Sequence, residues 1–279
     1  MKIEKVSDSV YADTGGEGNG NFGAIVLPSF IVAVDTSMFP TVAQTFRREI
    51  ESRTGKRAAI LMLTHYHADH VFGNQVYEDC KIISSEELKE KMIESAKSDW
   101  TPEGIKKFAQ GSPEIGDKLR DIKITFPTET FDSKYAFKDE GILVEAKHIG
   151  GHTTDSSYVY FPSEKILFSG DLIFSQRFPW GGDLTADPEK WLKGLKQLAK
   201  LKARLIVPGH GPVCDEKELQ KYIDFFERTN KIIRGIVSSG GSKDEVLGFK
   251  GYPEFYPPRR PESKQMTLSN WYDYYKSQL

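Results

Sequence analysis

The placement of histidine constrains this chain more than any other feature of its sequence. The chain has six histidines, and five of them fall at the ends of predicted strands, beside Gly, Asp or Thr. A histidine that satisfies hydrogen bonds inside a core is not usually placed in this way. The pattern therefore indicates metal ligands at His65, His67, His70, His152 and His210.

The segment THYHADH concentrates four candidate ligands directly after an apolar run at 57–63. On a loop, this spacing lets His65 and His67 point one way and Asp69 and His70 another, so that one segment serves two neighbouring ions. Imidazole and carboxylate donors without a thiolate suit zinc, and they leave manganese and iron open. We therefore predict two metal ions, with zinc favoured.

Each ion needs further ligands, and three later segments offer them. His152 lies in GGHTTDSS, Asp171 in SGDLIF and His210 in VPGHG, and we expect all three on turns at strand ends. Small neighbours let the backbone bend tightly and approach a metal. These neighbours are Gly150, Gly151, Ser169, Gly170, Gly209 and Gly211.

In this order, the segments THYHADH, GGHTTDSS, FSGDLIF and VPGHG resemble the ligand motifs of the metallo-β-lactamase-fold superfamily. The resemblance implies an α/β fold, a four-layer αβ/βα sandwich with the site at one edge between two sheets. It implies one metal held by His65, His67 and His152, a second held by Asp69, His70 and His210, and Asp171 as the bridge. A member that had lost its metals would show a substitution among these ligands, and this chain shows none.

The ligand set predicts a metal-dependent hydrolase. Two ions that share a water lower its pKa toward neutrality, which gives a hydroxide nucleophile at physiological pH. Asp69 would act as the catalytic residue by orienting that hydroxide toward an ester, lactone or phosphodiester bond of a small molecule. Two alternatives stay open: a mononuclear iron oxygenase of the same fold, and a non-catalytic metal-binding protein.

This sequence differs from better-known members of the superfamily, and the differences limit which substrates we expect. Hydroxyacylglutathione hydrolases and persulfide dioxygenases usually follow the bridging Asp with a Gly-Cys-Gly-Arg type of segment, which this chain lacks. The main zinc β-lactamase groups carry Cys or Ser where Asp171 stands, and flavodiiron reductases carry a carboxylate where His67 stands. Glutathione substrates, native β-lactam hydrolysis and di-iron redox chemistry are therefore disfavoured, although weak β-lactam turnover stays open.

Several other residues have two readings. Phe178 and Trp180 follow Asp171 closely enough to overhang the metals and bind substrate, or they cover the core beneath the strand end. Asp35 orients a ligand imidazole or caps a turn. His148 fits a supporting role better than an eighth ligand. No residue is clearly assigned to protonate the leaving group, because the candidates Ser156, Tyr158 and Tyr160 could equally well be packing residues.

The chain length favours one domain over 1–279. We expect a β-meander over 2–34, helices over 41–52, 85–97, 188–201, 216–237 and 267–278, and strands at 57–63 and 81–84. A second β-rich region should begin with the run IKITF at 122–126. The interrupted segment at about 85–120 predicts a helical insertion beside the site, and about 251–279 forms a C-terminal extension.

Composition limits the partners. Lys and Arg number 38 against 40 Asp and Glu, so no global positive field attracts nucleic acid, and we expect a small-molecule substrate. The longest apolar runs fall short of a membrane span. The N-terminus lacks a signal-peptide pattern, and the two cysteines suit a reducing compartment, so we expect a cytoplasmic protein. The oligomeric state stays open.

Overall fold

The strands of this chain form two sheets. The computed structural model describes residues 1–110, 113–119 and 121–279. Within these residues the first sheet has seven strands in chain order: β1 (Ile3–Lys5), β2 (Val10–Asp13), β3 (Phe22–Val26), β4 (Ile31–Val34), β5 (Ala58–Met62), β6 (Lys81–Ser85) and β7 (Glu129–Phe131). The second sheet runs in the order β12 (Leu205–His210), β11 (Ile166–Phe174), β10 (Ser157–Phe161), β9 (Ile142–His148) and β8 (Lys134–Asp139).

The first sheet changes direction part-way across. Strands β1 to β4 pair antiparallel, as the predicted meander requires, whereas β4 to β7 pair parallel. Parallel neighbours need a crossover connection, which α1 (Pro40–Thr54) supplies between β4 and β5. The carboxyl ends of β4, β5 and β6 therefore lie at one edge of the sheet.

Successive residues along the strands face opposite sides of each sheet, so each sheet packs against a hydrophobic core on both of its faces. In β4, Ile31 and Ala33 pack with α1, while Val32 and Val34 face the second sheet. In β10, Val159 faces the first sheet and Tyr158 faces the helices on the other side. Because successive strand side chains point to opposite faces, both sheets can be buried on both sides.

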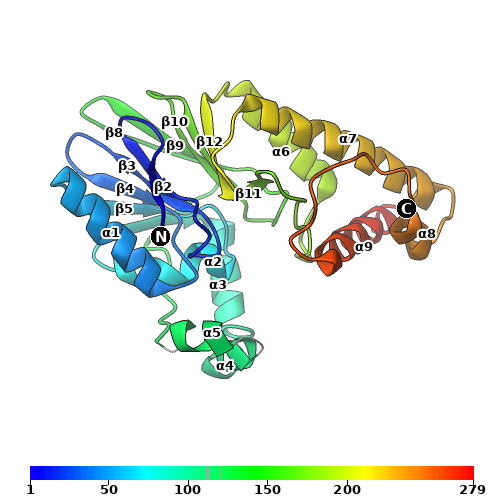
Figure 1. Cartoon of the computed structure of the whole chain (residues 1–279), viewed down its shortest axis with the longest axis horizontal. Helices are drawn as coiled ribbons and strands as arrows, with labels where there is room; N and C mark the ends of the chain where they lie inside the picture. Colours follow the sequence, from blue (N-terminus) through cyan, green and yellow to red (C-terminus); the bar gives the residue numbers. More distant parts are fainter. Residues whose placement is uncertain (111–112, 120) are drawn as a thin grey trace.

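Helices cover the outer face of each sheet. Figure 1 shows α1 beside the first sheet, and α6 (Pro188–Lys200) and α7 (Glu216–Ser238) beside the second. Asp187 caps the N-terminus of α6, and its carboxylate accepts hydrogen bonds from the N–H groups of Glu189 and Lys190. Its Trp191 is fully buried against α7 and the sheet. This arrangement confirms the predicted four-layer αβ/βα sandwich.

The segment at 122–126 was expected to be a strand, and that expectation is wrong. It has no strand structure, and the strand in this region is β7 at Glu129–Phe131. Ile122, Ile124 and Phe126 instead pack as an apolar loop against the core beside α1. Their alternating pattern reflects burial of one side of an extended loop, which sequence periodicity cannot distinguish from a strand.

Two helical segments lie outside the sandwich. After β6 come α3 (Glu86–Ala96), α4 (Pro102–Gln110) and α5 (Pro113–Gly116), in the region of the predicted insertion, whose residues 111, 112 and 120 lie outside the described ones. The chain ends in α8 (Lys243–Gly248) and α9 (Pro261–Ser277). Helix α9 begins earlier than predicted, because Pro261 occupies its first turn, where proline is well tolerated.

In the part of the chain that the structure describes, none of the helices combines the length and the apolar character that a membrane crossing needs.

Candidate metal centre

Four chain segments bring the predicted ligands together at one edge of the two sheets. His65 and His67 follow β5, and Asp69 and His70 lie in the short helix α2 (Ala68–Val71). His152 follows β9, and His210 is the last residue of β12. Because β5 and β12 belong to different sheets, the site forms where the two sheets meet.

Asp171 lies elsewhere than predicted. It was expected on a turn at a strand end, but it lies within β11, next to a shift in the pairing of β11 with β12 at Gly170. Gly170 has a φ of 50° there, in the left-handed region that glycine adopts without strain. The irregularity turns the Asp171 carboxylate toward the histidines.

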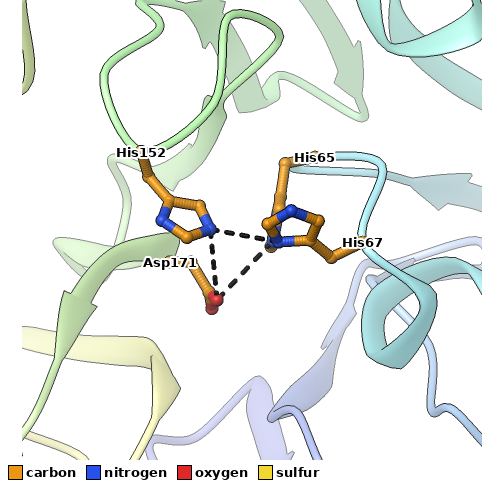
Figure 2. Close-up of side chains that lie close together, drawn as sticks. All are labelled: His65, His67, His152 and Asp171. Carbon is orange, nitrogen blue, oxygen red and sulfur yellow. Dashed lines mark hydrogen bonds and ion pairs between the residues drawn. The ribbon is translucent and has the colours of Figure 1, made fainter. Parts of the chain in front are cut away.

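The first group of candidate ligands consists of His65, His67, His152 and Asp171. Nδ1 of His67 lies 3.1 Å from Nε2 of His65 and 3.1 Å from Nε2 of His152. Oδ2 of Asp171 lies 3.6 Å and 3.5 Å from the same two Nε2 atoms. The side chains converge on one point (Figure 2).

These separations fit one metal ion surrounded by four ligand atoms in a tetrahedron. Ligand atoms about 2.0 to 2.1 Å from a zinc ion are about 3.3 Å apart along the edges of the tetrahedron. Three imidazole nitrogens and a carboxylate oxygen that converge on one point suit a cation, which can share all their lone pairs. The geometry and the chemistry of the donors therefore both fit a divalent metal.

The second group consists of Asp69, His70 and His210. Nε2 of His210 lies 3.5 Å from Oδ2 of Asp69 and 3.2 Å from Oδ2 of Asp171. Nε2 of His70 lies 3.2 Å from Oδ1 of Asp171. Asp171 therefore contacts both groups, which is the position that a bridging ligand needs.

Buried atoms without hydrogen bonds lie between the two groups. Nε2 of His70 and Oδ1 of Asp171 are buried 3.2 Å from each other, but neither atom makes a well-aligned hydrogen bond with a described residue. Buried polar atoms in proteins nearly always have a partner, and an ion between these groups would supply one. The residues present therefore fit two metal ions.

Burial and neighbouring charges adjust the protonation of the ligands. Burial lowers the pKa of His65 well below its usual value and that of His152 to about 3, so both imidazoles are neutral at pH 7 and keep a lone pair for a metal. Burial opposes ionisation of Asp171, but His210, His70 and His65 hold its pKa well below the usual range. The centre thus offers an ionised carboxylate among imidazoles.

Comparison with known protein families decides the classification. The family model described as the metallo-beta-lactamase superfamily matches residues 15–210 of this chain, a range that contains all seven candidate ligands.

The chain belongs to the metallo-beta-lactamase superfamily.

Two curated relatives carry the name beta-lactamase-like protein 2 homolog. The one from Caenorhabditis elegans is 25% identical over 253 residues, which cover 88% of this chain and 75% of the relative. The one from Drosophila melanogaster is 30% identical over 166 residues, or 59% of this chain and about half (49%) of the relative. Among solved structures, a metallo-beta-lactamase from Pontibacter korlensis matches with a TM-score of 0.63 at 22% identity, over 81% of this chain and 98% of that chain. This structural likeness supports the shared fold.

Asp35 supports the superfamily site through the second nitrogen of a ligand. Its Oδ2 lies 3.0 Å from Nδ1 of His70, and it also accepts a hydrogen bond from the hydroxyl of Thr64 at 2.7 Å. The Thr64 N–H donates to Oδ1 at 2.7 Å. A carboxylate in this position fixes the tautomer and the ring orientation of a ligand histidine. Of the two readings of Asp35, the structure favours the orienting one.

Asp183 makes a comparable contact that the sequence alone did not reveal. Its Oδ2 lies 3.1 Å from Nε2 of His67 and accepts a hydrogen bond from the Tyr66 hydroxyl at 2.6 Å. The only sequence signal was the turn-forming Gly-Gly pair before it, in a run that resembles other superfamily members. Nothing in that pattern points to His67.

Trp180 and Phe178 occupy different places. The Trp180 ring is 5.3 Å from the His67 ring and 5.9 Å from the His152 ring, so the indole lies beside the candidate ligands. Phe178 is buried and packs against Phe225 of α7. Of the two readings of Phe178, the structure favours the one in which it covers the core.

Other candidate residues lie away from the ligands. Nε2 of His148 lies 2.7 Å from the Thr154 carbonyl oxygen, a structural role that agrees with its interpretation as a supporting residue. Tyr158 and Tyr160 belong to the core between β10 and the outer helices. The Tyr160 hydroxyl donates to the Leu201 carbonyl oxygen, so it is not directed at the site.

Gly209 gives a test of the bridging position. A Cβ at this residue would overlap Oδ1 of Asp171, so we expect Gly209→Ala to displace that carboxylate and lower metal affinity at least tenfold. Overpacking should also destabilise the fold by about 1–3 kcal/mol. Metal content after dialysis and urea denaturation measure the two effects.

Gly235→Ala is the matched control for this substitution. Gly235 is an exposed helix position with nothing within 4 Å of an added Cβ, and alanine should stabilise it by about 0.5–1 kcal/mol. Wild-type metal content in Gly209→Ala would contradict the placement of Asp171.

Proposed function

We propose that this chain is a hydrolase that uses two divalent metal ions to cleave an ester, lactone or phosphodiester bond of a small molecule. The observation that carries the proposal is the position of Asp171, whose carboxylate contacts histidines of both ligand groups. Every ligand motif of the superfamily is filled with a residue that can bind metal. A member that had abandoned metal chemistry would have no need to keep both groups intact.

The residues divide the chemical work among them. Two metal ions held here would polarise the scissile carbonyl or phosphoryl oxygen and lower the pKa of a water. Asp69 is only partly buried and lies on the side of His210, so its carboxylate can accept a hydrogen bond from the attacking water and orient it. His65 and His152 could hold a metal without adding charge, because burial lowers the pKa of both imidazoles.

The donors favour zinc as the native metal. All candidate ligand atoms are imidazole nitrogens or carboxylate oxygens, and the first group has the separations of a tetrahedral site. Imidazole also binds iron and manganese, so both remain alternatives.

Apolar side chains beside the site favour a substrate with an apolar group. The Trp180 ring lies 5.3 Å from the His67 ring. Met266 of α9 is half exposed and lies near Gly182 together with Trp180. Apolar surface of this kind, next to polar groups that fix orientation, is typical of small-molecule sites.

The superfamily alone does not assign the bond that is cleaved. The names of the two curated relatives express a likeness to β-lactamases and state no substrate. The near-balanced charge of the chain favours a small molecule over nucleic acid. A cytoplasmic location stays a prediction.

The decisive experiment combines elemental analysis of the purified protein with a substrate screen. The panel is p-nitrophenyl phosphodiesters, lactones, thioesters and a chromogenic cephalosporin, each assayed before and after chelation and metal restoration. Two metal ions per chain and metal-dependent turnover of one class are expected. One iron per chain with oxygen uptake would establish the oxygenase instead, and bound metal without any turnover would favour a binding protein.

Asp69 gives a prediction specific to the mechanism. Asp69→Asn keeps the shape of the side chain but removes the charge that orients the water, so kcat should fall about 100-fold or more. The melting temperature should change little, and the exposed Asp8→Asn serves as the control. Wild-type turnover in Asp69→Asn would refute the role assigned to this carboxylate.

Trp180 gives a prediction about specificity. Trp180→Ala should change KM or the ranking of substrates while metal content stays at the wild-type level, because the indole contacts the ligand rings but is not a ligand itself. Phe108→Ala, which removes an exposed aromatic side chain from α4, is the control. If Trp180→Ala instead loses several degrees of melting temperature with an unchanged ranking, Trp180 is a core residue.

A further inference from the structure

We propose that Asp183 is a positioning residue that fixes His67 for metal binding, and that the C-terminal helix α9 holds Asp183 in place through Thr267 and Asn270. The inference rests on metal binding at the proposed centre. Its starting point is the orientation of His67, whose Nδ1 faces the other ligands while Nε2 faces the Asp183 carboxylate, 3.1 Å away.

The contact sets the tautomer of His67. A carboxylate can only accept a hydrogen bond, so the proton of a neutral His67 lies on Nε2 and the lone pair on Nδ1 points at the metal position. The opposite tautomer would aim an N–H group at the cation. Asp183 therefore selects the form of the imidazole that can bind.

Asp183 is itself held rigidly. The Tyr66 hydroxyl donates to Oδ2 at 2.6 Å, and Thr185 donates to Oδ1 from its N–H at 2.7 Å and from its hydroxyl at 2.6 Å. With His67 these groups supply four donors to one carboxylate that is almost fully buried. A buried charge is tolerated when its hydrogen bonds are satisfied in this way, so the carboxylate has little freedom to move from His67.

Helix α9 holds the backbone that carries Asp183. The Gly181 N–H donates to the Thr267 hydroxyl at 2.9 Å, and the Asn270 side-chain amide donates to the carbonyl oxygens of Gly181 and Asp183 at 3.1 Å and 3.3 Å. The bonds are made from one face of α9, since Thr267 and Asn270 are one turn apart.

This support comes from outside the part of the chain that defines the family. The family model matches residues 15–210, whereas α9 spans Pro261–Ser277. The C-terminal extension therefore contributes to the metal centre without providing a ligand. In this chain, a helix distant in sequence completes the support of His67.

The test compares variants of Asp183 with variants of the α9 residues that hold it. Asp183→Ala should lower the affinity of the first metal about 10- to 100-fold, the usual effect of losing such a partner, and leave the second metal unchanged. Asp183→Asn, which keeps an oxygen acceptor without the charge, should show a smaller loss. Asp35→Asn is the matched comparison, because it acts on His70 and should weaken the second metal instead.

The role of α9 is tested by the pair Thr267→Val and Asn270→Ala, with the exposed Gln265→Ala on the same helix as control. The pair should weaken the first metal, and it should add nothing to Asp183→Ala, because both changes act through one contact. Chelator competition gives the affinities, and the absorption spectrum of the cobalt-substituted protein reports the geometry.

A separate measurement tests the role of Asp183 in the metal-free protein and does not depend on enzyme activity. Proton–nitrogen NMR of the metal-free protein, recorded at a pH high enough for His67 to be neutral, should show His67 with its proton on Nε2 in the wild type and a mixture of tautomers in Asp183→Ala. An unchanged tautomer, or equal weakening of both metals, would overturn the positioning role. A correct tautomer and normal metal binding without turnover of any substrate would instead overturn the proposed function alone.

Discussion

The position of one buried carboxylate organises the rest of this structure. Asp171 lies among four imidazoles at the meeting edge of the two sheets, where burial alone would disfavour its charge. It occupies this place because β11 is irregular at Gly170 and because Gly209 of the neighbouring strand leaves room for it. The ligand loops, the strand pairing and the glycines all help to place the Asp171 carboxylate among the histidines.

The sequence indicated which side chains meet at the candidate metal centre, because each motif combines metal-binding residue types with a local signal for a strand end. The layered sandwich followed from the resemblance, and the apolar runs predicted only the individual strands and helices. The residues that support the ligands were harder to predict, since they depend on tertiary contacts. Asp183 is 116 residues from His67 in the chain, and no local pattern indicates that their side chains meet.

The two readings of Phe178 and Trp180, and the strand wrongly expected at 122–126, have related physical causes. Phe178 and Trp180 are two residues apart and share the same chemistry, yet one side chain packs against α7 and the other against the ligand rings. The route of an irregular loop decides this, and propensity gives no information about it. The apolar loop at 122–126 has the alternation of a strand but finds burial without strand pairing.

The ligands come from both sheets, and this has a consequence for the integrity of the whole molecule. His65, His67 and His70 belong to the half built on the first sheet, whereas His152, Asp171 and His210 belong to the second. Bound ions would therefore act as reversible cross-links between the halves, and their binding free energy would add to that of folding. Transient parting of the sheets, and with it access of proteases to the apolar interior, would then be governed by the concentration of free metal.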